Sequence, residues 1–513
     1  MATTYLTPGV YVEEVSRGTK PIEGVGTAVA AFVGVAETGP VGTPTMVANW
    51  SDFTEKFGGF LPGAYLAHSV YGYFNNGGGL CYVVRANSDG ATAELPAPQF
   101  VAELPARGGD NPVSLRAAAK EGDASQPVRI EVHDNEEGTF NLTITRGETV
   151  ENFENLTFGK GRDDRNVVEV VNRESKVVTL EEVNSRLSVP ERMPSPGAYP
   201  LVAQQQQPVE AVETSPEAYR GDAASRTGLG GLEAIEEVTM VCAPDAMAAY
   251  QAGALDAKGV QAIQQALIDH CELMKDRVAI LDPLPDFNVQ EVNDWRVNQV
   301  GYDSKYAALY YPWIEVADPT PGSPNPSIVV PPSGHIAGIW ARNDSERGVH
   351  KAPANEVIGG AIGLPLRVTD SEQGVLNPNG VNCIRAFPGR GIRVWGARTL
   401  SSDPEWRYVN VRRLFNFIEK SIQRGTQWAV FEPNDYALWQ RIKRDITAFL
   451  KRIWMSGALF GATPEEAFFV KCDEENNPPE TRDAGQLFID IGIAPVKPAE
   501  FIIFRIGQYS PEQ

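Results

Sequence analysis

Apolar and amphipathic segments alternate through the middle of the chain. Residues 238–242 and 278–281 are short apolar runs, and the segment between them, 259–275, carries a helical stripe made by Val260, Ile263, Leu267 and Cys271. A strand, a helix and a second strand in this order are typical of a βαβ unit in a parallel sheet. A third strand at 307–314 and a helix at 333–342 continue this α/β pattern.

Residues 91–228 have a different pattern from the segments on either side. Short alternating runs at 128–132 and 140–144 are typical of β-hairpins, and 190–208 is a polar loop rich in proline and glutamine. From residue 92 to 226 there are 23 acidic and 14 basic residues, a balance of −9. We therefore expect a solvent-facing, β-rich insertion at 91–228 that divides an α/β core domain into two parts, 26–90 and 229–380.

Two amphipathic helices are expected in a C-terminal domain at 381–495. The first, 411–424, has an apolar stripe; the second, 434–454, has another, with Asn434 as a plausible N-cap. The stretch from 385 to 454 has 14 basic and 6 acidic residues, a balance of +8 in an acidic chain. Opposed apolar and basic stripes on consecutive helices favour contact with an acidic partner. The basic residues on the polar faces are Arg413, Lys420, Arg424, Arg441, Arg444, Lys451 and Arg452.

The terminal segments, 1–25 and 496–513, are predicted to be extended arms. A β-prone run lies in each, and glycine or proline separates each run from the body of the chain. An unpaired apolar strand needs a partner, and backbone pairing within the chain or with a neighbouring chain would supply one. The strand residues are Val10, Tyr11, Val12, Val15, Phe501, Ile502, Ile503 and Phe504, and the hinge candidates are Gly18, Gly24, Gly26, Pro495 and Pro498.

Composition excludes several classes of function. The 513 residues include 45 Lys and Arg against 66 Asp and Glu, so the net charge is −21, which argues against a nucleic-acid binder. No apolar stretch reaches the roughly 20 residues that span a bilayer, and the first residues lack the pattern of a secretory signal. We therefore expect folding in a cytoplasm, without membrane insertion.

Signals for catalysis are weak. Motifs for nucleotide binding, zinc proteases and nucleophilic serine are missing, and the five cysteines and five histidines are scattered. Asp245 and Asp282 follow strands, where α/β enzymes often place functional groups, but a helix cap or a turn explains both. We expect no enzymatic activity, no cofactor and no metal.

Several segments together resemble the sheath protein of contractile phage tails and phage-tail-like injection systems. They are TPGVYVEEV, GVGTAVAAFVGVAETGP, RAFPGRGIRVWGARTL, YVNVRRLFNFIEKSI, the segment 471–480 and IGIAPVKPAEFIIFRIGQ. Their order and coverage, over residues 1–90 and about 230–513, make the match specific. The resemblance implies an α/β (α+β) multidomain fold with a mixed sheet flanked by helices, a β-rich outer insertion and extended arms.

The resemblance also implies a function and partners. Sheath subunits polymerise helically around an inner tube, exchange arm strands with neighbours, and contract to drive the tube through a target envelope. The basic helix faces would then meet the tube, and baseplate and cap proteins would be further partners. The particle would assemble in the cytoplasm and act as a virion tail or as a released phage-tail-like particle.

Two rival interpretations remain open from the residues alone. An α/β hydrolase or transferase could be built on the βαβ unit, and it would form a small closed oligomer. A lattice-forming shell protein of another family would form sheets or shells without an inner tube.

Overall fold

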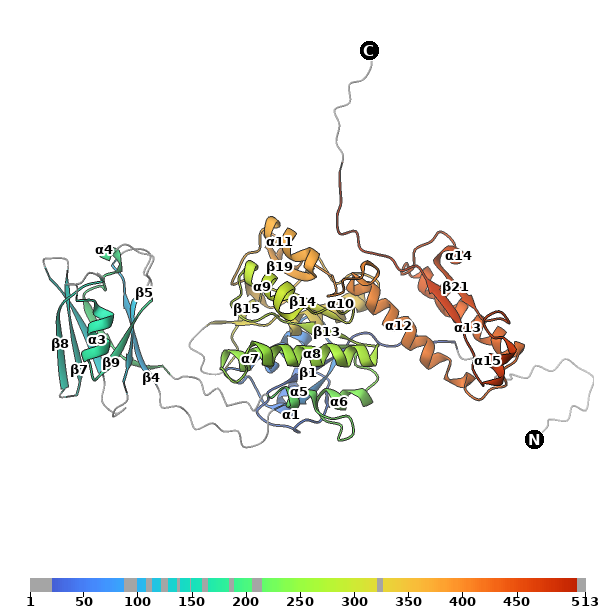
Figure 1. Ribbon diagram of the computed structural model, residues 1–513, viewed down its shortest axis with the longest axis horizontal. Helices are drawn as coiled ribbons and strands as arrows, with labels where there is room; N and C mark the ends of the chain where they lie inside the picture. Colours follow the sequence, from blue (N-terminus) through green and yellow to red (C-terminus); the bar gives the residue numbers. More distant parts are fainter. Residues whose placement is uncertain are drawn as a thin grey trace, which may run out of the picture. The chain divides into compact units, whose positions relative to one another are not determined.

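The computed structural model describes residues 21–86, 99–107, 113–120, 128–135, 139–147, 149–158, 165–183, 189–204, 215–320 and 326–504 (Figure 1). The chain divides into two compact units. The larger consists of Met1–Ala91 and Val212–Gln513, and the smaller is Thr92–Ala211.

A nine-stranded mixed sheet is the centre of the larger unit, in the order β17-β20-β19-β14-β13-β12-β1-β3-β2. Its middle strands are parallel, whereas β2, β17 and β20 pair antiparallel at the two edges. The strands are β1 (Val29–Gly34), β2 (Thr45–Val47), β3 (Leu80–Arg85), β12 (Met240–Cys242), β13 (Val278–Leu281), β14 (Ala307–Tyr311), β17 (Glu356–Val357), β19 (Val381–Phe387) and β20 (Gly391–Val394).

Both faces of this sheet are covered. Every residue of β12, β13 and β14 is buried, and successive side chains of a strand point to opposite faces. Such continuous apolar runs are typical of parallel strands between layers of helices, which confirms the predicted α/β core. The surrounding helices are α1 (Trp50–Phe57), α2 (Leu66–Asn75), α5 (Pro216–Arg220), α6 (Gly228–Gly231), α7 (Asp245–Gln251), α8 (Ala257–Met274), α9 (Val289–Asp294), α10 (Ser333–Arg347) and α11 (Asp370–Leu376). A small antiparallel sheet is formed by β15 (Ile314–Ala317), β16 (Ser327–Val330) and β18 (Ala361–Gly363).

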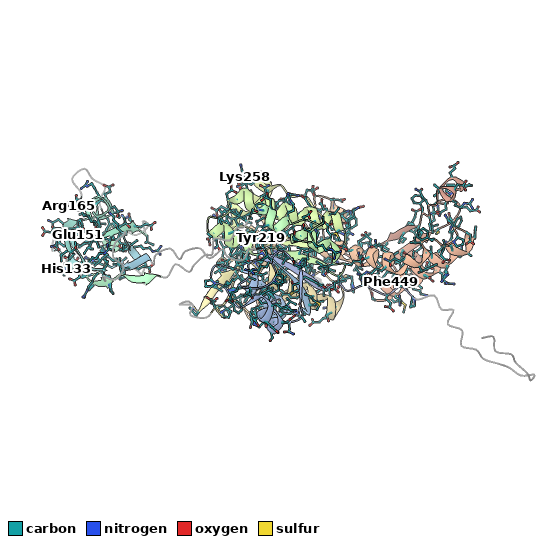
Figure 2. The ribbon with its side chains drawn as sticks, turned by 90° about the horizontal axis from the view of Figure 1, so that it is seen from below. His133, Glu151, Arg165, Tyr219, Lys258 and Phe449 are labelled. Atoms are coloured by element: carbon teal, nitrogen blue, oxygen red, sulfur yellow. The ribbon has the colours of Figure 1, made fainter. Side chains whose placement is uncertain are left out.

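The C-terminal part of the larger unit is a pair of long helices with a two-stranded sheet. Its elements are α12 (Val409–Gly425), α13 (Tyr436–Met455), α14 (Pro464–Ala467), β21 (Phe468–Lys471), α15 (Pro479–Asp483) and β22 (Asp490–Ile493). Leu414, Ile418, Ile442, Ile446 and Phe449 share one hydrophobic core, which confirms the apolar stripes (Figure 2 labels Phe449). The N-cap of α13 is Asp435, whose side chain accepts from the Leu438 amide, and not Asn434. Asn434 instead accepts from the indole nitrogen of Trp439 at 2.8 Å.

The smaller unit is β-rich, as the sequence predicted. Two antiparallel four-stranded sheets, β10-β6-β7-β8 and β11-β4-β5-β9, contribute to one hydrophobic core together with α3. Its elements are β4 (Gln99–Pro105), β5 (Val113–Ala119), β6 (Val128–Asp134), β7 (Phe140–Arg146), β8 (Thr149–Leu156), α3 (Val167–Glu174), β9 (Val178–Glu182), α4 (Val189–Arg192), β10 (Gly197–Pro200) and β11 (Val202–Gln204).

The structure differs from the sequence prediction at two domain boundaries. Tyr219 on α5 is fully buried in the core of the larger unit (Figure 2), so residues 215–228 do not belong to the insertion. Strands β19 and β20 are part of the nine-stranded sheet, so residues 381–394 belong to the α/β core and not to the C-terminal domain. Both errors have the same cause, because short segments at a boundary carry no periodic signal for the core against which they pack.

Candidate functional site

The first half of the predicted basic surface faces the protein's own core. Arg413 on α12 is 3% exposed and makes a two-pronged ion pair with Asp344 of α10, with contacts of 2.9 and 2.5 Å. Its guanidinium also donates to the Thr27 carbonyl at 2.9 Å and lies 4.7 Å from the centre of the Trp340 ring. Arg413 is therefore enclosed, and its predicted contact with an inner tube is wrong for this structure.

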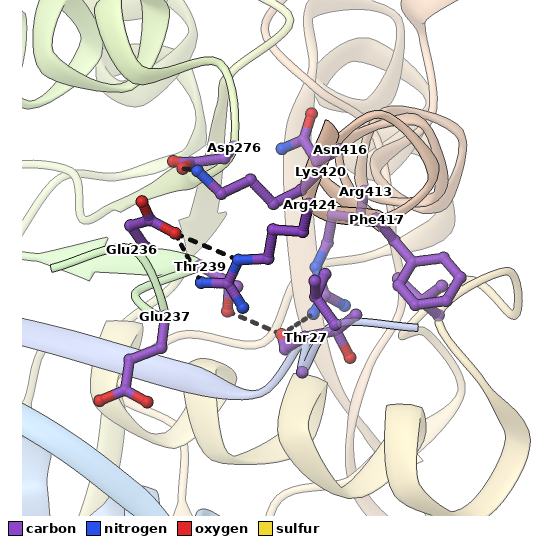
Figure 3. Close-up of a pocket in the computed structure, with 13 residues that line it drawn as sticks. Thr27, Glu236, Glu237, Thr239, Asp276, Arg413, Asn416, Phe417, Lys420 and Arg424 are labelled. Carbon is purple, nitrogen blue, oxygen red and sulfur yellow. Dashed lines mark hydrogen bonds and ion pairs between the residues drawn. The ribbon is translucent and has the colours of Figure 1, made fainter. Parts of the chain in front are cut away.

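Two further basic residues of α12 continue this internal contact (Figure 3). Lys420 lies 3.2 Å from a carboxylate oxygen of Asp276, and Arg424 donates to Glu236 at 2.9 Å. The Arg424 hydrogen bond and the charge of Lys420 hold the pKa of Glu236 below its ordinary value. Lys420 is 16% exposed and pairs within the chain, which corrects its prediction as a tube contact. Arg424 is 39% exposed beside a Glu236 that is itself 58% exposed, so its contact with a tube stays a prediction.

The basic residues of α13 have a different environment. Arg441, Arg444 and Lys451 are exposed; Arg441 stacks 4.0 Å from the Trp428 ring, and Arg444 is 3.3 Å from Asp445. Arg452 is exposed but donates to the Ile22 carbonyl. All four residues are exposed and stay predictions as partner contacts.

The loop between α12 and α13 exposes apolar side chains that the sequence did not single out. Phe431 is 103% exposed at a left-handed φ of 68°, and the preceding Val430 is 65% exposed. A bulky residue at positive φ is uncommon because the backbone is strained there. The sequence signal was only two apolar residues before Glu432 and Pro433, where the helical stripes stop.

Residues 21–28, called the N-terminal strap below, connect the C-terminal helices to strand β1. Ile22 is 1% exposed within the core of α12 and α13. The Val25 amide donates to the Ser421 hydroxyl at 3.1 Å, and a side chain at Gly24 would lie 2.8 Å from the Phe417 ring. Close packing thus gives a reason for glycine at position 24, whereas a side chain at Gly26 would meet no neighbour within 4 Å. Both stay predictions as hinges. Gly18 and the strand residues Val10, Tyr11, Val12 and Val15 lie outside the described residues.

At the other terminus, residues 501–504 are exposed and form no strand. Phe501, Ile502, Ile503 and Phe504 are 71%, 72%, 79% and 83% exposed. The predicted β-strand at 499–508 is therefore not formed over 499–504, and the rest lies outside the described residues. The exposed apolar run itself is as the sequence predicted. Before it, Pro495 bridges to Leu459, and the Pro498 carbonyl accepts from the Glu500 amide at 3.1 Å.

A groove of about 890 Å³ lies beside this segment. Arg347, Trp395 and Arg398 line it from the core, and Lys497, Phe501 and Ile502 line it from the C-terminal segment. The C-terminal segment thus forms part of the wall of this groove.

Asp245 and Asp282 serve as helix caps. Asp245 accepts from the amides of Val35, Tyr65 and Leu66 beside the start of α2, and Asp282 accepts from the Ser333 amide at the start of α10. Burial raises the pKa of Asp245 to about 6 and that of Asp282 to about 7. Their partners are backbone groups, which agrees with the capping interpretation given above.

Within the residues that the structure describes, no group of three or more potential metal ligands occurs. Among the same residues, no helix is both long and apolar enough to cross a membrane.

An apolar run on an extended terminal segment is typical of a subunit that assembles with other chains. The comparison with known families defines this class further. Residues 228–400 match the phage tail sheath protein central domain, and residues 401–508 match the phage tail sheath C-terminal domain, together more than half of the chain. The chain belongs to the phage tail sheath family, and it is a structural sheath subunit.

Curated relatives agree with this assignment over part of their length. The tail sheath protein of Salmonella phage ViI is 29% identical over 279 residues, 51% of this chain and 42% of the relative. That of Escherichia phage P2 is 30% identical over 174 residues, 33% of this chain and 42% of the relative. The chain thus matches less than half the length of each.

Solved structures resemble the chain over nearly its whole length. The PVC sheath complex of an extracellular contractile injection system, in its contracted state, is 25% identical with a TM-score of 0.58, covering 99% of both chains. The contracted helical sheath of the anti-feeding prophage is also 25% identical, with a TM-score of 0.58, covering 98% of this chain and 100% of the other. These likenesses confirm the expected sheath fold.

Proposed function

We propose that this chain polymerises helically around an inner tube, that its arms add strands to neighbouring copies, and that contraction of the polymer drives the tube through a target envelope. The observation that carries the proposal is the run of four exposed apolar side chains at 501–504. Burying such a side chain contributes about 1.5–3 kcal/mol. The run is therefore a strong driving force for association once a neighbour covers it.

The two-stranded sheet β21–β22 is a suitable receiving surface. Each strand has one neighbour within the described part of the chain, so both outer edges can pair with a further strand. Phe469 on β21 and Phe488 just before β22 are 59% and 51% exposed. A neighbour's arm would gain backbone hydrogen bonds worth about 0.5–1.5 kcal/mol each, together with apolar contact.

The exposed basic residues of α13 support contact with an acidic tube. Pairs of this kind are worth roughly 0–1 kcal/mol each, so many weak contacts can hold an extended sheath and still release together. Baseplate and cap proteins are further proposed partners, as is assembly in the cytoplasm before action in a tail or tail-like particle. The chain has no catalytic role in this proposal.

Electron microscopy of the purified full chain tests the arm contact. The wild type is expected to form hollow cylinders, and replacing residues 501–504 by serine is expected to leave folded subunits without cylinders. Val150→Ser is a matched control, because Val150 is 56% exposed in the insertion. Cylinders formed equally by the 501–504 variant would refute the arm contact.

A second experiment tests the tube contact. Arg441→Glu with Arg444→Glu should reduce co-assembly with an acidic tube protein while leaving tube-free cylinders intact. Unchanged co-assembly would show that another surface meets the tube.

A further inference from the structure

Glu500, the residue before the exposed apolar run, is bound tightly to the core. Arg398 donates to both of its carboxylate oxygens, at 3.0 Å to Oε1 and 2.6 Å to Oε2. Asn377 donates to Oε1 at 2.7 Å, and the Tyr408 hydroxyl donates to Oε2 at 3.0 Å. The Glu500 carboxylate thus accepts four hydrogen bonds, although the segment that carries it is extended.

The three donors come from separate elements and are themselves fixed. Asn377 follows α11, Arg398 follows β20, and Tyr408 is the N-cap of α12. The Arg398 amide donates to the buried side chain of Asn382 at 2.7 Å, and its guanidinium donates to the Asn377 carbonyl at 3.1 Å. The site for Glu500 is therefore built into the core and does not depend on the arm.

The hydrogen bonding of the segment differs on the two sides of Glu500. Before it, the Val496 carbonyl accepts from Asn410 at 3.2 Å. After it, residues 501–504 make no hydrogen bond within the described part of the chain, and all four are exposed. Among the residues that the structure describes, Glu500 is thus the last one of the C-terminal segment that is hydrogen-bonded to the core.

We propose that Glu500 is a positioning residue that anchors the C-terminal arm and fixes where the exchangeable part of the arm begins. This inference rests on the proposed exchange of arms. Without the anchor, the free segment would begin after Val496, and the four added residues would extend its reach by roughly 14 Å at about 3.3–3.6 Å each. The longer arm could then reach a neighbour's binding site from many relative positions of the two subunits. The distance between subunits would no longer be fixed.

A purely structural role is the alternative, and the two roles predict different results. If Glu500 served only stability, its loss would lower the unfolding temperature, and assembly would follow stability. If Glu500 positions the arm, its loss changes assembly while the subunit remains folded. The region offers a matched control, because Asp370 lines the same groove, is 92% exposed and pairs with Arg385 at 2.6 Å.

The experiment compares Glu500→Ala, Glu500→Gln and Asp370→Asn in the full chain. Hydrogen exchange of the hydrogen-bonded amides of residues 496 and 500 is measured on unassembled subunits, and cylinders are examined by electron microscopy. We expect Glu500→Ala to speed exchange of these amides at least tenfold and to give few or irregular cylinders, with an unfolding temperature within a few degrees of wild type. Glu500→Gln, which keeps the shape but not the charge, should be intermediate, and Asp370→Asn should behave as wild type.

Regular cylinders of wild-type helical pitch, or unchanged exchange of the amides of residues 496 and 500, would overturn the anchor. A fall in unfolding temperature that accounts for the assembly defect in both Glu500 variants would also overturn it. Failure of the proposed function gives a different result. A chain without residues 501–513 would then assemble normally, while the exchange measurement on unassembled Glu500 variants would still report on the anchor.

Discussion

Removing Arg413 should separate the C-terminal helices from the core, because its ion pair is internal. The side chains of Arg413 and Asp344 are 3% and 4% exposed, and the pair joins α12 to α10. In Arg413→Ala, the Asp344 carboxylate remains buried without the guanidinium that pairs with it. The Thr27 carbonyl loses its donor at the same time.

The magnitude follows from burial. Removing one partner of a buried pair costs about 3–5 kcal/mol, whereas removing an exposed pair costs about 0–1 kcal/mol. Arg424→Ala is the matched control on the same helix, since the side chains of Arg424 and Glu236 are 39% and 58% exposed. The double variant Arg413→Met with Asp344→Leu should recover most of the loss, because it leaves no unpaired buried charge.

Urea titration combined with hydrogen exchange measures this effect locally. Peptides from α12 report the free energy of opening of the helix against the core, even where the whole chain does not unfold in two states. A loss below about 1 kcal/mol in Arg413→Ala would refute the assignment of a buried internal pair. Equal losses in Arg413→Ala and Arg424→Ala would do the same.

Three further predictions concern single residues. Since burial raises the pKa of Asp282 to about 7, the native state keeps a proton that the unfolded state loses, and this contribution to stability disappears as pH rises from about 4 to 7. Asp282→Asn should therefore remove a slope of roughly 1.4 kcal/mol per pH unit from urea titrations across that range. Asp245→Ala should cost more than about 3 kcal/mol in urea titration, because three buried amides lose their acceptor; a loss below 1 kcal/mol would contradict this. Phe431→Gly should change the free energy of unfolding by less than about 1 kcal/mol, because relief of left-handed strain offsets the entropy of glycine, and a loss above 2 kcal/mol would show a packed ring.

Periodic apolar patterns predicted much of the fold because periodicity reports burial directly. The apolar run at β13 and the apolar stripe of α8 predicted the parallel sheet, and the apolar stripes of α12 and α13 predicted the C-terminal helices. Their ends were less certain, as the capping of α13 by Asp435 instead of Asn434 shows. Two residues with similar capping chemistry stand side by side there, and only the local turn decides between them.

The basic face of α12 could not be placed from the sequence. A row of Arg and Lys opposite an apolar stripe indicates a polar environment, but water, a partner protein and the chain's own carboxylates all supply one. Asp276, Asp344 and Glu236 lie far from α12 in the chain, and no local pattern connects them with it. Ile22 was missed for a similar reason, since a single apolar residue among glycines and prolines has no periodicity.

The two terminal segments are fixed at different places on the larger unit. The N-terminal strap is held between α12 and α13 through Ile22, whereas the C-terminal segment is held on the α/β core through Glu500. If neighbours hold both arms, tension in the first arm therefore reaches the C-terminal helices before strand β1. The internal ion pairs of α12 join these helices to the α/β core.

Ile22→Ala tests this connection. Truncating a buried isoleucine costs about 2–5 kcal/mol, and the loss should appear as faster hydrogen exchange in residues 21–28 and in α12, while β13 and β14 stay protected. Ile362→Ala is the control, because Ile362 is 61% exposed on β18. We expect less assembly in Ile22→Ala and normal assembly in Ile362→Ala, because the strap is then no longer attached firmly to the C-terminal helices. Normal cylinders from this variant, despite a loosened strap, would show that the attachment at Ile22 carries no force between subunits.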